Sequence, residues 1–283
     1  MAIARCVDAV ARRLPNRIYK IYFHMRARAV GRFKSANNSS PPALRQNAAN
    51  EWDVVDPDSG LRLHLPHRNR AITYCGGVEK RLRSVYASYG LEGWLLPGDL
   101  VIDCGANVGE IGITARRIGA SYVAFEPDPL AYAALRENVP AGVVVNKALY
   151  SSTGVLEFHL ATSDADSSIF GPLGSRVPAV TVQTTTLDEY VRMQKINRIR
   201  LVKIEAEGAE PEVLEGSTTA LAFTDLVAVD VGPERLGEST LVPVLTFLED
   251  HGFEVAWISE SGFRALFVKS GLETGVTARR RDD

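Results

Sequence analysis

The sequence Val101-Ile-Asp-Cys-Gly-Ala-Asn-Val-Gly109 decides the fold of this chain. It contains most of a short apolar run, Leu100–Cys104, and the spacing of apolar residues from Val108 to Ile118 then becomes helical. Glycines at such a junction let the backbone turn tightly and come close to a ligand. The stretch therefore predicts a strand, a ligand-binding turn and a helix.

Outward from this turn, short apolar runs alternate with helical segments. Strands separated by helices of about ten residues need crossover connections, which produce a mostly parallel sheet. The short link between the last two runs permits an antiparallel pair, and two alternating segments predict an inserted β-hairpin. We predict an α/β fold with a doubly wound sheet, whose ligand site lies at the carboxyl ends of the strands. The predicted strands are residues 100–104, 122–125, 143–145, 201–204, 226–231, 254–258 and 264–268, with the hairpin at 155–160 and 179–183.

The turn itself indicates which cofactor it accepts. It reads Asp103-x-Gly105-x-Asn107-x-Gly109, so Asn107 stands where a dinucleotide-binding turn has its middle glycine. A pyrophosphate needs close backbone approach at that position, and the carboxylate of Asp103 would repel its phosphates. S-adenosylmethionine has an amino group and a sulfonium and no phosphate, so it suits an acidic turn. The turn therefore disfavours NAD and FAD.

Glu126 ends the next predicted strand, 21 residues after Gly105. An acid at this place accepts hydrogen bonds from ribose hydroxyls in doubly wound nucleotide-binding folds. Many surface loops carry a glutamate for other reasons. Here, however, a strand, an acidic glycine turn, a helix, a second strand and a terminal glutamate occur in register, and together they favour an adenosyl ligand.

A set of sequence blocks extends beyond the turn. In chain order they are Val101–Gly109, Phe125-Glu-Pro-Asp-Pro129, Asn146-Lys-Ala148 with Gly154, Thr186-Leu-Asp188, and Lys203-Ile-Glu-Ala-Glu-Gly-Ala-Glu210 with Leu214 and Gly216. Over roughly Leu95 to Lys269 the chain resembles the FkbM-type S-adenosylmethionine-dependent methyltransferases. The resemblance implies a seven-stranded, Rossmann-like class I methyltransferase sheet. It also implies O-methylation of a small hydroxylated acceptor, such as a sugar, a glycolipid or a natural product.

The resemblance assigns a cofactor site by position. The turn residues would hold S-adenosylmethionine, Glu126 would bind its ribose, and Lys147 and Ala148 would lie near its adenine edge. The turn residues assigned in this way are Asp103, Gly105, Asn107 and Gly109.

Methyl transfer also needs a positioned and deprotonated acceptor oxygen. Glu205, at the end of a strand beside the cofactor strand, is the first candidate base and Glu207 the second. Lys203 is placed to pair with either acid and lower its pKa. The family usually has Asp where this chain has Glu205, so either the acceptor sits differently or Glu205 is not the base. Alternatively, the acids from Glu207 to Glu210 simply begin a helix, and no spacing among them requires a metal.

The formal net charge of −2 is the sum of a strongly basic N-terminal segment and an acidic remainder. Residues 1–50 contain ten Lys and Arg against one acid, whereas residues 51–283 contain 22 against 33. Apolar residues in the basic arm recur every three or four positions, which predicts an amphipathic helix interrupted at Pro15. Residues 1–34 would then lie on an anionic membrane surface, act as a transit peptide, or pack on the body. The apolar row is Val7, Val10, Leu14, Ile18, Ile21 and Met25.

The composition, 46% hydrophobic and 23% charged, is that of a globular protein and excludes collagen-like, coiled-coil and wholly disordered chains. Three cysteines without ligand spacing predict neither a disulfide framework nor a zinc site. We find no apolar run typical of a membrane span or a secretory signal, and expect a cytoplasmic protein that its arm can bring to a membrane. The predicted organisation is a basic arm and linker (1–50, the linker being 35–50), a lead-in (51–94), a methyltransferase domain (95–270) and a tail (271–283).

Two other functions remain open at this point. One is a catalytically silent adenosyl-binding module that its basic arm recruits. The other is a nicotinamide oxidoreductase, against which the missing middle glycine counts. Nucleic acid is disfavoured as the methyl acceptor, because no basic groove is evident around the predicted site in the acidic body.

Overall fold

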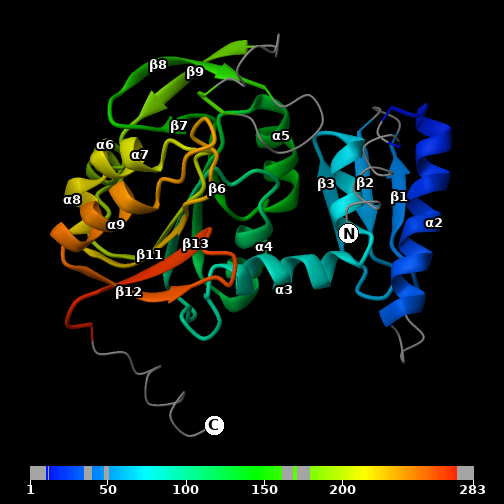
Figure 1. Cartoon of the computed structure of the whole chain (residues 1–283), viewed down its shortest axis with the longest axis horizontal. Coiled ribbons are helices and arrows are strands. Elements are labelled where there is room, and N and C mark those ends of the chain that lie inside the picture. Colours follow the sequence, from blue (N-terminus) through cyan, green and yellow to red (C-terminus); the bar gives the residue numbers. More distant parts are fainter. Residues whose placement is uncertain are drawn as a thin grey trace, which may run out of the picture.

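The computed structural model describes residue 11 and residues 13–34, 40–47, 51–160, 168–170 and 179–272. Its body is built on a seven-stranded sheet in the order β12-β13-β11-β10-β4-β5-β6 (Figure 1). Strand β13 runs antiparallel to both neighbours, and the other neighbouring pairs are parallel. The predicted doubly wound sheet with an antiparallel last strand is confirmed. The strands are β4 (Leu100–Cys104), β5 (Ser121–Phe125), β6 (Val143–Val145), β10 (Ile199–Ile204), β11 (Thr224–Asp230), β12 (Phe253–Ile258) and β13 (Arg264–Lys269).

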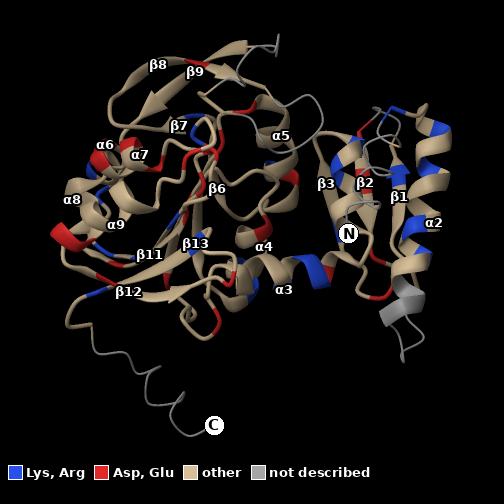
Figure 2. Cartoon of the chain, viewed as in Figure 1, with Lys and Arg blue, Asp and Glu red and all other residues tan. Residues whose placement is uncertain are grey.

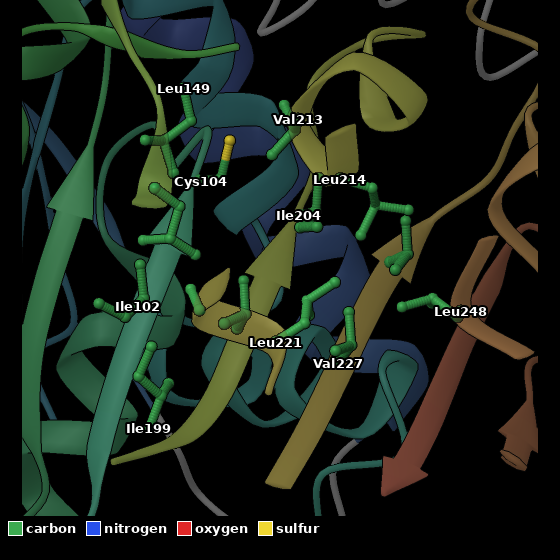
Figure 3. Close-up of a cluster of buried hydrophobic side chains, with 14 of the residues drawn as sticks. Ile102, Cys104, Leu149, Ile199, Ile204, Val213, Leu214, Leu221, Val227 and Leu248 are labelled. Carbon is green, nitrogen blue, oxygen red and sulfur yellow. The ribbon is translucent and has the colours of Figure 1, made fainter. Parts of the chain in front are cut away.

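The two faces of this sheet bury different side chains, because successive residues of a strand point to opposite sides. In β4, Ile102 and Cys104 belong to the cluster drawn in Figure 3, whereas Val101 belongs to the cluster on the other face. Four helices contribute side chains to the first cluster: α6 (Leu187–Gln194), α7 (Glu210–Glu215), α8 (Thr218–Leu221) and α9 (Leu241–Asp250). Three contribute to the second: α3 (Val78–Ser88), α4 (Glu110–Ile118) and α5 (Pro129–Asn138). Coverage on both faces explains why the central strands β4, β5, β10 and β11 are largely apolar.

Between β6 and β10 the chain forms a small second sheet in the order β7-β9-β8. Its antiparallel pair, β8 (Gly154–His159) and β9 (Ala179–Thr185), is the predicted hairpin, and β7 (Ala148–Leu149) pairs in parallel with β9. Ser168 lies beside β8, and its hydroxyl donates a hydrogen bond of 2.9 Å to the backbone oxygen of Glu207. The insertion is therefore held against the loop that follows β10.

A further group of elements lies beside the body and is called the N-terminal layer here. It consists of α2 (Asn16–Lys34), β1 (Ala43–Gln46), β2 (Trp52–Val55), β3 (Arg62–Leu65) and the 3-10 helix η1 (Arg68–Tyr74). The three strands form an antiparallel sheet, and α3 leads from the layer to the body (Figure 1). The layer has its own apolar core, which also includes Val108 of the glycine turn.

The N-terminal layer corrects two predictions. Residues 35–50 are not only a linker, because Ala43–Gln46 pairs with β2 as a strand. Helix α2 begins at Asn16, directly after the Pro15 at which we expected an interruption, and it packs through Tyr19, Phe23 and Ala27. Aromatic side chains bury more apolar area than the predicted row does, so they take the inner face. In the predicted row, Ile18, Ile21 and Met25 are 48%, 56% and 64% exposed, and Val7 and Val10 lie outside the described residues.

One side chain ties the layer to the body. Asn138, at the end of α5, accepts a hydrogen bond from the backbone nitrogen of His64 at 2.7 Å and donates to its backbone oxygen at 3.0 Å. The same amide donates to the backbone oxygen of Val108 at 2.8 Å. Asn138 thus joins the edge of β3 to the glycine turn, and the layer has a defined position next to that turn.

Candidate active site

The glycine turn between β4 and α4 brings two strand ends together. Gly105 has a φ of +68°, and a Cβ atom built there would lie 1.9 Å from the backbone oxygen of Glu205. Only glycine permits this approach, because the obstacle is backbone and cannot move aside as a side chain would. The turn therefore holds the ends of β4 and β10 in contact.

Gly109 has a different task at the end of the same turn. Its φ is +86°, and a Cβ atom there would lie 2.7 Å from side-chain carbons of both Leu135 and Val139. Glycine allows α5 and the residue that follows it to pack closely against the start of α4. The structure gives Gly109 this packing role, and Gly109 is not among the residues that line the cavity described next.

A cavity of about 380 Å³ lies at the carboxyl ends of β4, β5 and β10, where the topology predicts a ligand site. The N-terminal layer and α3 contribute to its wall through His67, Arg70 and Arg81. Lys147, predicted at the adenine edge, is not one of its lining residues. The predicted site residues that do line it are Asp103, Gly105, Asn107, Glu126, Ala148, Lys203, Glu205 and Glu207.

Buried charges cross the strand ends beneath this cavity. Lys203 is 2% exposed and pairs with Asp103 at 3.0 Å and with Glu205 at 3.1 Å. Its ammonium also donates a hydrogen bond of 2.9 Å to the backbone oxygen of Gly105. Asp103 is fully buried and accepts a hydrogen bond of 2.6 Å from the hydroxyl of Tyr122. Lys203 therefore holds two carboxylates and the glycine turn at once.

The chain of charges continues through a residue that the sequence analysis missed. Arg264, the first residue of β13, pairs with Glu205 at 3.0 Å and with Asp230 at 2.8 Å. Its guanidinium also lies 4.5 Å from the ring centre of Tyr89, a cation–π contact. We call Asp103, Lys203, Glu205, Arg264 and Asp230 the ion-pair chain. No sequence spacing pointed to Arg264, because its partners lie 59 and 34 positions earlier and meet it only through strand pairing.

The ion-pair chain sets the basicity of Glu205. Burial by itself raises the pKa of Glu205, but the cations of Lys203 and Arg264 outweigh it and lower the pKa to about 2. Burial lowers the pKa of Lys203, but the carboxylates of Asp103 and Glu205 outweigh that effect and raise it. Both groups are charged at neutral pH, and Glu205 is a weak proton acceptor.

Glu126 occupies a very different environment. Its two oxygens accept hydrogen bonds from the backbone nitrogens of Asn107 at 2.7 Å and Asp128 at 2.9 Å. Burial raises the pKa of Glu126 to about 7, although these two hydrogen bonds act in the opposite direction. Glu126 is therefore a lining carboxylate that changes its charge near neutral pH.

The sequence also showed no sign of a second polar cluster, which is centred on Glu110. Glu110, the first residue of α4, pairs with Arg81 at 2.8 Å and with Arg70 at 3.3 Å. It also accepts a hydrogen bond of 2.9 Å from the hydroxyl of Tyr74. The arginines precede Glu110 by 29 and 40 positions, in α3 and η1, so no local motif links them to the turn.

The residues present fit S-adenosylmethionine. The ion-pair chain has three carboxylates and two cations, and a cationic ligand without phosphate complements that excess. The buried Oδ1 of Asn107 has no hydrogen-bond partner among the described residues, so it remains available as an acceptor in the turn. Within that same part of the chain, no cluster of His, Cys, Asp and Glu suits a metal ion.

The sheet order, the antiparallel β13 and the acid-lined turn at the end of β4 are those of the class I, Rossmann-like methyltransferase fold. Residues 103–264 match the family model described as the methyltransferase FkbM domain. The chain belongs to the FkbM methyltransferase family, and S-adenosylmethionine is its cofactor.

Two characterised relatives are similar to the chain. The hexuronic acid methyltransferase AglP of Haloferax volcanii is 31% identical over 137 residues, which are 47% of this chain and 56% of the relative. The chain therefore matches only a little over half of that protein. The 2-O-methyltransferase NoeI of Sinorhizobium fredii is 26% identical over 206 residues, which are 64% of this chain and 83% of the relative.

A solved structure is also similar to the chain. It is the magnesium protoporphyrin IX methyltransferase from Synechocystis PCC 6803 with bound S-adenosylmethionine. The comparison has a TM-score of 0.43 and 15% sequence identity, and covers 68% of this chain and 79% of that one.

We predict that Lys203→Met destabilises the protein by about 3–5 kcal/mol, because it leaves two carboxylates without their shared buried cation. Chemical denaturation followed by circular dichroism measures the free energy of unfolding. Lys195→Met changes an exposed lysine and should alter that free energy by less than about 0.5 kcal/mol. Equal unfolding midpoints for the two variants would show that the ion-pair chain does not support the sheet.

Proposed function

We propose that this chain transfers the methyl group of S-adenosylmethionine to a hydroxyl group of a small acceptor, with a sugar as the leading candidate. The observation that carries the proposal is the acid-lined cavity at the ends of β4, β5 and β10 in a chain of the FkbM family. The two characterised relatives, one named for a hexuronic acid and one for 2-O-methylation, support a sugar hydroxyl as the acceptor group.

In this proposal the cofactor lies along the turn. Bound there, it supplies a methyl group on a positively charged sulfur. Glu126 accepts hydrogen bonds from the ribose hydroxyls, and Ala148 borders the adenine end. The excess carboxylate of the ion-pair chain, with Asp103 at its end, lies toward the cationic end of the cofactor.

The geometry also favours one of the two candidate bases. Glu205 is paired with a cation on each oxygen, and a carboxylate with a pKa of about 2 accepts a proton poorly. We propose that Glu205, held by Lys203, positions the acceptor instead. Glu207 lines the same cavity and follows two residues later, so it is the proposed base.

A nicotinamide oxidoreductase is not favoured by any contact in the described site. The carboxylates of Asp103 and Glu205 lie beside the turn, where a pyrophosphate would need to sit. A pyrophosphate there would add negative charge next to an ion-pair chain that already has more carboxylates than cations, and like charges in a buried site repel.

A methyl-transfer screen tests the proposed function. The full chain is incubated with S-adenosylmethionine labelled in its methyl group and with a panel of neutral sugars, uronic acids and lipid-linked sugars. We expect label in at least one sugar, and Glu207→Gln should lower kcat by about 10²- to 10⁴-fold, the usual contribution of a general base. Glu205→Gln should mainly raise KM. Binding of the cofactor without transfer to any acceptor would favour a catalytically silent module.

We predict that cofactor affinity depends on pH through Glu126. Its ionised form accepts hydrogen bonds from ribose, so affinity is full above the pKa of about 7 and falls by up to about tenfold per pH unit below it. Titration calorimetry with S-adenosylhomocysteine from pH 5.5 to 8.5 measures this dependence. Glu126→Gln should bind more weakly and without that dependence, whereas the exposed control Glu137→Gln should behave as the unmodified chain. A similar pH profile in both variants would remove Glu126 from the ribose site.

We also propose that the outer face of α2 binds an anionic membrane surface. Ile18, Ile21 and Met25 are exposed in one row, and the exposed Arg17 and Arg28 flank it. Figure 2 shows basic residues at several places along the described part of this helix. Apolar side chains bordered by cations complement anionic lipid. None of the described helices is both long and apolar enough to cross a bilayer.

Vesicle sedimentation tests the membrane proposal. The chain should sediment with phosphatidylserine-containing vesicles at low ionic strength and be released at about 1 M salt, where charge screening is nearly complete. Replacing Ile21 and Met25 by Ser should abolish sedimentation. Val242→Ser alters an apolar residue that is 71% exposed on α9 and should leave it unchanged. Equal binding by both variants would contradict a role for α2.

A further inference from the structure

The cavity wall that comes from outside the methyltransferase sheet carries two arginines. Arg70 belongs to η1 and Arg81 to α3, and both line the cavity. Their side chains are 11% and 34% exposed. They are therefore largely buried cations that still border the space in which a ligand would lie.

One carboxylate serves both of these cations. Glu110 pairs with Arg81 through one oxygen at 2.8 Å and with Arg70 through the other at 3.3 Å. The oxygen facing Arg81 also accepts the hydrogen bond of Tyr74. Burial raises the pKa of Glu110, but the arginines outweigh that effect and lower it, so Glu110 is ionised at neutral pH. Two cations and one anion leave one positive charge within the cluster of Glu110, Arg70 and Arg81.

Arg70 is also incompletely satisfied by its protein partners. Its contact with Glu110 is 3.3 Å long, which is weak for a charge-assisted hydrogen bond. Its buried Nε has no hydrogen-bond partner among the described residues. A guanidinium has five N–H donors in a planar fork, so donors remain after these contacts. Fixed donors with a net positive charge suit a planar anion.

We infer that Arg70 and Arg81 form a subsite for a carboxylate within the cofactor and acceptor cavity. The inference rests on the proposed function and deepens it, because it assigns the N-terminal layer a part in ligand recognition. A carboxylate can come from two sources. S-adenosylmethionine carries one on its methionine end, and a uronic acid acceptor carries one on its sugar ring.

The alternative is that the two arginines only neutralise Glu110. A single arginine can serve that purpose, as Arg235 does for Glu212 through two hydrogen bonds of 2.8 and 2.7 Å. The two arginines also come from separate elements that converge on one cavity, whereas Arg117 pairs with Glu79 away from it. Charge beyond neutralisation, placed at a cavity, is what a ligand subsite requires.

Paired ligands distinguish the two sources by titration calorimetry. S-adenosylhomocysteine and 5′-methylthioadenosine share the adenosyl group, but only the first has a carboxylate. Glucuronate and glucose share a sugar ring, but only the first has a carboxylate. The variants are Arg81→Met and Arg70→Lys, with Arg117→Met as the control, and circular dichroism confirms that each is folded.

The expected result is a loss of affinity confined to one carboxylate ligand. Losing a charge-assisted hydrogen bond should weaken binding about 10- to 100-fold in Arg81→Met. If the variants bind S-adenosylhomocysteine more weakly but bind 5′-methylthioadenosine as tightly as the unmodified chain does, the subsite holds the carboxylate of the cofactor. If the variants bind glucuronate more weakly and their affinity for neither adenosyl ligand changes, the subsite holds the carboxylate of the acceptor. In either case Arg70→Lys should show a smaller loss, because it keeps the charge and loses the fork.

Three results would be read differently. The subsite is overturned if Arg81→Met and Arg70→Lys both bind S-adenosylhomocysteine and glucuronate as tightly as the unmodified chain does. This holds even if the unmodified chain binds glucuronate no more tightly than glucose. Equal weakening of ligands with and without a carboxylate overturns it as well, because the variants would then have disturbed the cavity as a whole. Failure of the unmodified chain to bind either adenosyl ligand refutes the proposed function instead.

Discussion

The buried ammonium of Lys203 is the constraint on which the site depends. A lysine in the core is costly unless carboxylates compensate it, and here the compensation comes from neighbouring strands. Parallel pairing sets Lys203 beside Asp103 across β10 and β4, and antiparallel pairing sets Asp230 beside Arg264 across β11 and β13. A slip of one residue would move these side chains to opposite faces of the sheet. The charges of the site are therefore compensated only when the strands pair in the correct register.

The same constraint gives two lining glutamates different chemistry. Glu205 lies between two cations, so its pKa falls to about 2 and its carboxylate is ionised at neutral pH. Among the described residues, Glu126 accepts hydrogen bonds from two backbone nitrogens, which compensate burial less, so its pKa rises to about 7. Environment rather than residue type separates their roles, as in other sites that use several carboxylates. A carboxylate that keeps its negative charge is suited to positioning an acceptor. A carboxylate that titrates near neutral pH accepts hydrogen bonds from a ligand only while it is ionised.

The N-terminal layer completes the cavity from a distant part of the sequence. Asn138 holds the edge of β3 against the glycine turn. Glu110 forms ion pairs with Arg70 of η1 and Arg81 of α3. The layer stays together because α2 buries Tyr19 and Phe23, while its other face remains in solvent (Figures 1 and 2). Basic residues thus lie at two places, on the outer face of α2 and at the cavity wall, where Arg70 comes from η1 and Arg81 from α3.

The sequence alone determined the doubly wound sheet, the glycine turn with Asp103, and Glu126 after the second strand, because apolar periodicity and turn residues are local signals. The family blocks added the cofactor and the acids after β10. Only the tertiary structure decided which face of α2 is buried, that Gly109 serves packing, and that Arg264, Arg70 and Arg81 reach the site. These outcomes depend on contacts between residues far apart in the chain. Sequence spacing carries no record of such contacts, since strand pairing and layer packing create them.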